Sequence, residues 1–155
     1  MSDRDRKKKI SAAAIQALKE ALTYAYWYKP DLRSFLSNTI SDPSIIARLN
    51  WGEYKRNIVT SLVDYLARHE DRFQGHLLRL MTETANISDF SHLARLEDGQ
   101  SKVQKAESAV KALRSQIKGH LDLMDEEKAI EKRRAESHDR IMQVTAVKER
   151  LAELM

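Results

Sequence analysis

The chain has 155 residues and a mass of 17.9 kDa, which allows one ordinary domain and an extension. Only 4 glycines and 2 prolines occur, which disfavours a turn-rich β fold, and the absence of cysteine excludes disulfides, thiolate metal sites and a cysteine nucleophile. No apolar run reaches the roughly 20 residues needed to span a bilayer. We therefore expect an all-α, cytoplasmic protein that does not enter a membrane.

Residues 1–10 are expected to form a basic tail. They hold five basic and two acidic side chains and so carry most of the net charge of +4, whereas the rest of the chain is nearly neutral. A solvated tail is the simpler interpretation, and weak attraction to phosphates or to a membrane surface is the alternative.

Residues 11–97 are predicted to form a bundle of five or six short helices. Ser11 is a suitable N-cap for a first helix that runs to about Trp27. Pro30 ends that helix and opens the second, because proline fits the first turn of a helix but not its interior. The pair Asp42–Pro43 gives the same signal for a short third helix.

Two more helices follow in this predicted bundle. Gly52 marks the turn into the fourth helix. Glu70 and Asp71 precede the fifth helix, because acidic side chains are favourable at a helix N-terminus. Apolar residues recur at helical spacing and should place one face of each helix in the core. The expected core consists of Ile15, Leu18, Leu22, Ala25, Leu32, Phe35, Leu36, Ile45, Ile46, Leu49, Tyr54, Ile58, Leu62, Tyr65, Leu66, Phe73, Leu77, Leu80, Met81, Leu93 and Leu96.

The end of the predicted first helix is crowded with aromatic residues, which are Tyr24, Tyr26, Trp27 and Tyr28. Packing against the Pro30 turn is the simplest interpretation, and a docking surface is the second, because Trp and Tyr dominate such surfaces. Stacking of single-stranded nucleic acid comes third, since it needs cations between the rings and only Lys29 and Arg33 are near in sequence. The candidate partner-binding residues are Tyr24, Trp27, Tyr28 and Arg33.

The chain contains the runs ALKEALTYAYWYKPDLRSFLSNTI at residues 17–40 and NIVTSLVDYLARHEDRFQGHLLRLM at residues 57–81. These runs resemble the effector-associated domains of bacterial conflict systems, which are small death-fold-like helical modules, and the resemblance covers about residues 12–85. It implies homotypic or heterotypic docking that links an effector to its sensor, often in antiviral defence. It also implies that the chain is the front part of a longer protein, in which a coiled coil leads to an effector domain.

Residues 98–155 are predicted to form a helical coiled-coil extension that begins at Asp98 and Gly99. One helix from Val103 to Met155 would be about 80 Å long, too long to be buried on a globule about 25 Å across. Apolar residues follow the a/d spacing of a coiled coil in two stretches that are out of phase by one residue. These predicted oligomerisation residues are Val103, Val110, Leu113 and Ile117, followed by Val144, Val147, Leu151 and Leu154.

Two arrangements of the extension are consistent with this pattern. A charged block at residues 125–140 separates the two apolar stretches, so the extension either pairs between chains or folds back as a hairpin near Gly119. We favour pairing between chains, and therefore a homo-oligomer. The basic residues within 102–118 suggest nucleic-acid binding instead, but the acidic residues within 122–127 would repel the same phosphates.

No sequence motif indicates catalysis, a cofactor or a metal. The histidines at 69, 76, 92, 120 and 138 lack the short spacings of a metal site, and neither a glycine-rich phosphate loop nor a GxSxG motif occurs. His120 lies on the predicted coiled-coil seam, where its role is either to make association pH-sensitive or, as for most histidines on a seam, simply to lower stability. We expect a non-catalytic protein–protein interaction and oligomerisation module that docks a matching helical domain. The alternative is a helical protein that binds nucleic acid through the basic tail and residues 102–118.

Overall fold

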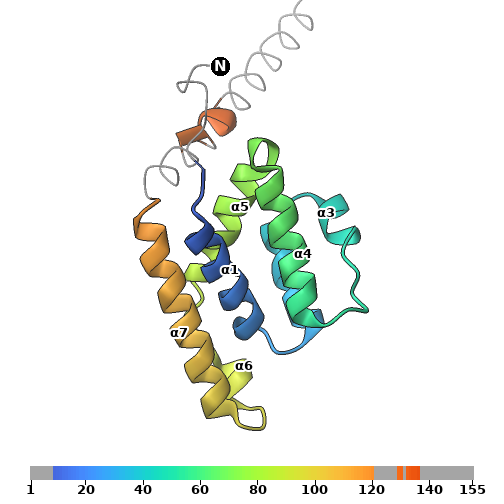
Figure 1. The fold of residues 1–155 in the computed structure, drawn as a ribbon, viewed down its shortest axis with the longest axis vertical. Coiled ribbons are helices and arrows are strands. Elements are labelled where there is room, and N and C mark those ends of the chain that lie inside the picture. The colour runs from blue at the N-terminus through green and yellow to red at the C-terminus, as the bar shows by residue number, and fades with distance from the viewer. Residues whose placement is uncertain (1–8, 121–128, 131, 137–155) are drawn as a thin grey trace, which may run out of the picture. The chain divides into compact units, whose positions relative to one another are not determined.

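The computed structural model describes residues 9–120, 129–130 and 132–136, and every regular element within these ranges is a helix (Figure 1). The prediction of an all-α fold is thereby confirmed for the described chain. No described helix has both the length and the apolarity to cross a membrane. The labelled helices are α1 (Ala12–Ala25), α2 (Lys29–Thr39), α3 (Pro43–Ala47), α4 (Lys55–Arg68), α5 (Glu70–Ala85), α6 (Ser91–Ala94) and α7 (Gly99–Lys118).

Local sequence signals set several of these helix ends. The hydroxyl of Ser11 accepts a hydrogen bond from the Ala14 amide, so this predicted N-cap is confirmed, and the Asp42 carboxylate likewise accepts one from the Ser44 amide at the start of α3. Proline lies in the first turn of α2 and of α3. Helix α1 ends at Ala25, two residues earlier than predicted, because the backbone of Tyr26 is extended.

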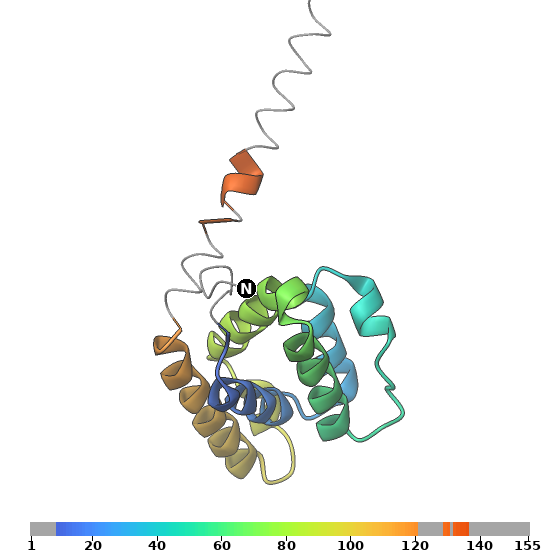
Figure 2. The ribbon, with the colours of Figure 1, turned by 45° about the horizontal axis from the view of Figure 1, so that its top comes forward.

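Helix α1 is the centre of the bundle. It lies between α7 on one side and α4 on the other, and it also contacts α5 (Figure 2). Three alanines and two leucines of α1 have no exposed surface, and the alanines let neighbouring helices come close. These residues are Ala14, Leu18, Ala21, Leu22 and Ala25.

Helix α7 belongs to the same compact unit as the bundle, which corrects the expected domain boundary at residues 97–98. The unit ends at Leu121, and a second unit begins at Asp122. The predicted boundary is a tight turn in which Asp98 has a left-handed backbone with a φ of 53°. Gly99 packs so closely on α6 that a Cβ atom there would lie 2.3 Å from the Ala94 carbonyl oxygen. The chain therefore turns back here and does not lead away.

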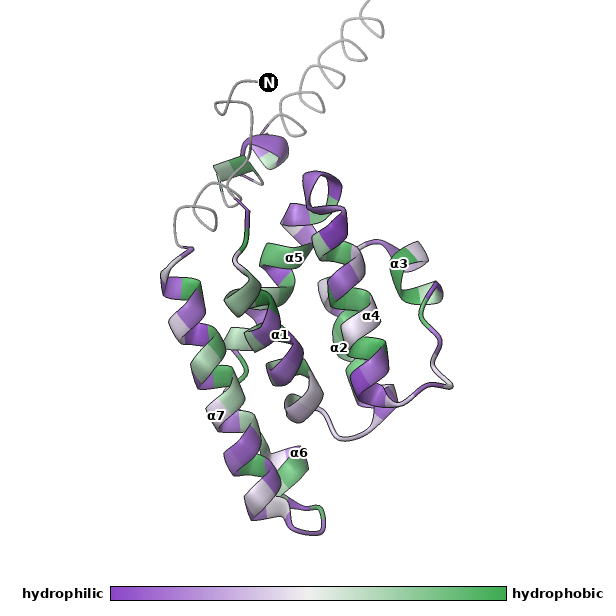
Figure 3. Cartoon of the chain, viewed as in Figure 1, coloured by the Kyte–Doolittle hydropathy of each residue, from purple (hydrophilic) through white to green (hydrophobic). Residues whose placement is uncertain are grey.

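The apolar residues of α7 are used inside the chain, which corrects their assignment to an intermolecular seam. Val110 and Leu113 are buried, Val103 and Ile117 are partly exposed, and the contact between α7 and α1 is the most extensive between any two helices. Hydrophobic and hydrophilic residues alternate along α7 as on any amphipathic helix (Figure 3). The same spacing suits a coiled coil and a helix packed on its own bundle. The second predicted stretch, residues 144–154, lies outside the described residues.

His120 ties the two ends of this unit together. The Ser11 amide donates to His120 Nε2 over 3.1 Å, so the other ring nitrogen, Nδ1, carries the proton and donates to the Gln116 carbonyl oxygen over 3.0 Å. Beside it, the Ile10 amide donates to the buried carboxylate of Glu70. His120 was expected on a seam between chains, whereas it holds the start of α1 against the end of α7 within one chain.

The packing of α7 predicts that Leu113→Ala will lower the free energy of unfolding by about 2–5 kcal/mol, because a fully buried leucine is lost and a cavity remains. Urea unfolding of the full chain measures the loss. Lys111→Ala, an exposed change two residues away, is the control and should alter it by less than about 0.5 kcal/mol. Equal stability of the two variants would mean that α7 is not part of the core.

Candidate functional site: an aromatic end with a basic groove

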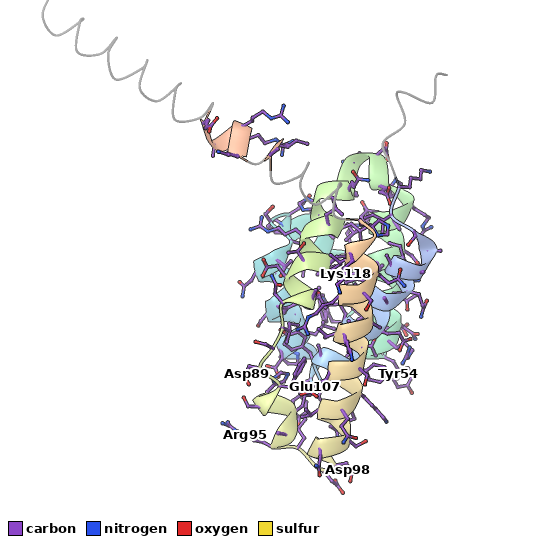
Figure 4. All side chains as sticks on the ribbon, turned by 90° about the vertical axis from the view of Figure 1, so that its left-hand side faces the viewer. Tyr54, Asp89, Arg95, Asp98, Glu107 and Lys118 are labelled. Carbon is purple, nitrogen blue, oxygen red and sulfur yellow. The ribbon has the colours of Figure 1, made fainter. Side chains whose placement is uncertain are left out.

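Among the described residues, the large apolar side chains that remain exposed gather at one end of the bundle. Trp27 is 50% exposed, Tyr28 55% and Tyr54 81%. Trp27 and Tyr28 join α1 to α2, and Tyr54 immediately precedes α4. We call this surface, together with Tyr24, the aromatic end. Tyr54 lies in the same half of the bundle as Asp98, while Lys118 lies in the other half (Figure 4).

A groove of about 760 Å³ adjoins Trp27, and we call it the basic groove. The end of α1, the start of α4 and the start of α7 form it, so it depends on segments that are far apart in the sequence. Four of its lining side chains are cations and one is a carboxylate. The lining consists of Thr23, Tyr24, Trp27, Lys55, Arg56, Asp98, Ser101, Lys102 and Lys105.

Two lysines lie over the ring of Trp27. Lys102 Nζ is 4.3 Å and Lys55 Nζ is 5.2 Å from its centroid, which are distances for cation–π attraction. Lys55 Nζ also donates to the carbonyl oxygens of Tyr26 and Trp27, over 2.5 and 3.3 Å. Lys102 Nζ donates to the Glu97 carbonyl oxygen. Backbone carbonyls and an aromatic ring thus hold both ammonium groups in place.

The four cations of the groove differ in whether their charge is balanced. Arg56 donates to the Glu20 carboxylate over 3.1 Å and also reaches the Tyr24 hydroxyl at 3.4 Å. Lys55, Lys102 and Lys105 form no ion pair within the described part of the chain. The groove therefore holds three ammonium groups that no neighbouring carboxylate directly neutralises.

The protonation of Lys55 reflects this environment. Burial of the ammonium group, with a smaller contribution from the charge of Arg56, lowers the pKa of Lys55 from an ordinary 10.5 to about 8. Because the folded chain releases this proton at lower pH than the unfolded chain, the charged form opposes folding at neutral pH. This cost disappears as the pH rises from about 8 to 10.5.

The structure brings together only part of the predicted partner-binding set. Tyr24 and Trp27 line the basic groove, and Tyr28 is exposed next to Trp27. Arg33 does not line the basic groove, and its guanidinium lies 5.1 Å from the ring centre of Trp51. Tyr54 was expected in the core, but it is the N-cap residue of α4, where the helical spacing that predicted its burial does not yet apply.

Sequence reasoning did not group the four cations of the groove, because they come from two distant helices. Lys55 and Arg56 open α4, whereas Lys102 and Lys105 belong to the first turns of α7. The spacing of Lys102 and Lys105 did signal a shared helix face. Nothing in the sequence indicated that this face lies beside Trp27.

The basic residues of α7 do not form one continuous stripe. At about 100° of rotation per residue, Lys111, Arg114 and Lys118 lie on a different side of the helix from Lys102 and Lys105. Arg114 is also occupied, because it donates to the carbonyl oxygens of Ala85 and Ile87 over 2.6 and 3.0 Å.

The described histidines do not form a metal site, and His92 has a role in packing. No group of three histidine, aspartate or glutamate side chains there is arranged to hold a metal ion. His92 Nε2 lies 2.7 Å from the Ala25 carbonyl oxygen, and its ring stacks on Tyr26, so it closes the end of α1.

Comparison with known proteins found no matching family model, no matching curated protein and no matching solved structure.

The groove predicts a measurable property of Lys55. A ¹³C NMR titration of its side chain should give a pKa of about 8, and Trp27→Ala should raise that value toward 10.5, because removing the indole admits water. Lys111→Ala, on α7 but outside the groove lining, should leave the pKa of Lys55 unchanged. A wild-type pKa near 10.5 would show that the groove does not desolvate this lysine.

Proposed function

We propose that the chain is a non-catalytic protein–protein interaction module whose docking surface is the aromatic end. The observation that carries this proposal is the gathering of Trp27, Tyr28 and Tyr54, exposed, at one end of a bundle whose other described large apolar side chains are at least partly buried. Tryptophan and tyrosine contribute most of the binding energy at many interfaces. Contiguous exposed apolar surface is typical of interaction sites.

The resemblance to effector-associated domains is consistent with this use of the surface. In that setting the partner is a protein with a matching helical domain, and docking connects a sensor to an effector in a bacterial defence system. The chain then contributes recognition, and the effector chemistry belongs to another domain.

We propose that the chain also oligomerises, through its second apolar stretch at residues 144–154. Val110 and Leu113 are buried against the bundle of their own chain and are not available for a partner. Val144, Val147, Leu151 and Leu154 keep the spacing of a coiled-coil seam.

Nucleic-acid binding along residues 102–118 has weaker support than protein docking. A helix lying on phosphates would present its cations on one face. The basic residues of α7 are divided between two faces, and Arg114 is bound to backbone carbonyls.

Photo-cross-linking in the cells that make the protein tests the docking surface. Tyr54→p-benzoylphenylalanine should give a discrete cross-linked product, whose mass shows whether the partner is a second copy or another protein. Adding Trp27→Ala should reduce the yield at least about fivefold, because an interface tryptophan of this kind is worth more than about 1 kcal/mol. The matched control places the same photoreactive residue at Lys111, which is exposed on the opposite side of α7 from Lys102 and Lys105. Equal products from both positions would refute the assignment.

Light scattering of the full chain tests oligomerisation. We expect a mass above the 17.9 kDa of one chain, and the pair Leu151→Glu and Leu154→Glu should reduce it to that value, because carboxylates on a coiled-coil seam are buried without partners. Glu153→Gln, which changes a residue between them, should leave the mass unchanged. A wild-type monomer would refute association through residues 144–154.

A further inference from the structure

We propose that the basic groove binds an acidic segment of the partner protein, with its carboxylates at Lys55, Lys102 and Lys105. This inference rests on the proposed docking function, and it adds the chemistry of the partner and the place where that chemistry is recognised.

The first observation behind this proposal is that the groove has positive charge without counterions among the described residues. Three of its ammonium groups, those of Lys55, Lys102 and Lys105, lack an ion-pair partner in the described chain, while Arg56 is already paired with Glu20. Lys105 is exposed and makes no hydrogen bond to the described residues. A carboxylate entering the groove therefore meets positive charge that no internal anion competes for directly.

The second observation is that hydrogen bonds to backbone carbonyls hold two of these lysines in place. An ammonium group has three N–H donors. Lys55 uses two of them on the carbonyl oxygens of Tyr26 and Trp27, and Lys102 uses one on that of Glu97. Each side chain is held in position and still has a donor for an incoming anion, so less side-chain freedom is lost on binding.

The groove suits a short acidic peptide better than a single-stranded nucleic acid. Asp98 lines the groove and Glu20 pairs with Arg56, so the uncompensated charge is confined to Lys55, Lys102 and Lys105 and matches a few carboxylates rather than a continuous run of phosphates. Base stacking needs a free aromatic face. Lysine ammonium groups already lie over the ring of Trp27.

Desolvation of Lys55 supports the same ligand. Burial without a counterion holds the pKa of this lysine at about 8. A carboxylate within a few ångströms stabilises the protonated form, so binding should raise this pKa. The groove thus contains a group that reports directly on whether an anion has entered.

Fluorescence anisotropy of the full chain with a fluorescein-labelled decapeptide of glutamate and leucine tests the proposal. We expect binding that weakens with added salt and falls at least about tenfold in the double variant Lys102→Ala and Lys105→Ala, as expected when two charge pairs are lost. Lys111→Ala together with Lys118→Ala removes the same charge from the other side of α7 and should bind like the wild type. All variants should unfold at the same urea concentration as the wild type. Saturating peptide should also raise the pKa of Lys55.

Three results would overturn the proposal. One is absence of binding to the acidic decapeptide, and another is an equal loss in both double variants. The third is binding of oligo-dT of matched charge that is tighter and shows the same dependence on Lys102 and Lys105, which would assign the groove to nucleic acid. The cross-linking at residue 54 separates these failures from failure of the docking function. If the cross-link persists while the peptide does not bind, the aromatic end docks a protein without an acidic segment in the groove.

Discussion

The packing of α7 on α1 is the contact on which the rest of this structure depends. The alanines of α1 leave little side-chain volume between helices, so a neighbour can approach closely and cover them. Helix α7 supplies that neighbour, and the hydrogen bond from Ser11 to His120 joins the beginning of one helix to the end of the other. Because the two helices lie against each other, the start of α7 lies beside the end of α1, and the basic groove forms there.

In the basic groove, the same lysines hold the ring of Trp27 and supply the positive charge. Trp27 is too exposed to belong to the core, yet it is held by Lys55 and Lys102, whose ammonium groups also bind backbone carbonyls. Carbonyls and ring faces stabilise a cation without cancelling its charge. Lys55 and Lys102 therefore keep their positions, and no ion-pair partner within the described chain neutralises them in the absence of a ligand. An anionic ligand can gain from both properties, because neither an internal counterion nor a mobile side chain must first be displaced.

The proposed docking function would have two components, the aromatic end and the basic groove. Exposed rings offer apolar contact area, and the uncompensated lysines select for charge. A partner with acidic residues around an apolar side chain would satisfy both. In the proposed docking function, this pairing would distinguish one partner from others of similar shape but different charge.

The sequence by itself determined the helices and several of their ends, because these depend on contacts within a few residues. Ser11 and Asp42 cap the helices that follow them, and the spacing of Val110 and Leu113 correctly marked the apolar face of α7. Only the tertiary structure decided what covers that face, since the same spacing serves a partner chain and the chain's own bundle equally well. It likewise decided the site, because Trp27, Lys55 and Lys102 are distant in sequence and meet only once α1, α4 and α7 have packed.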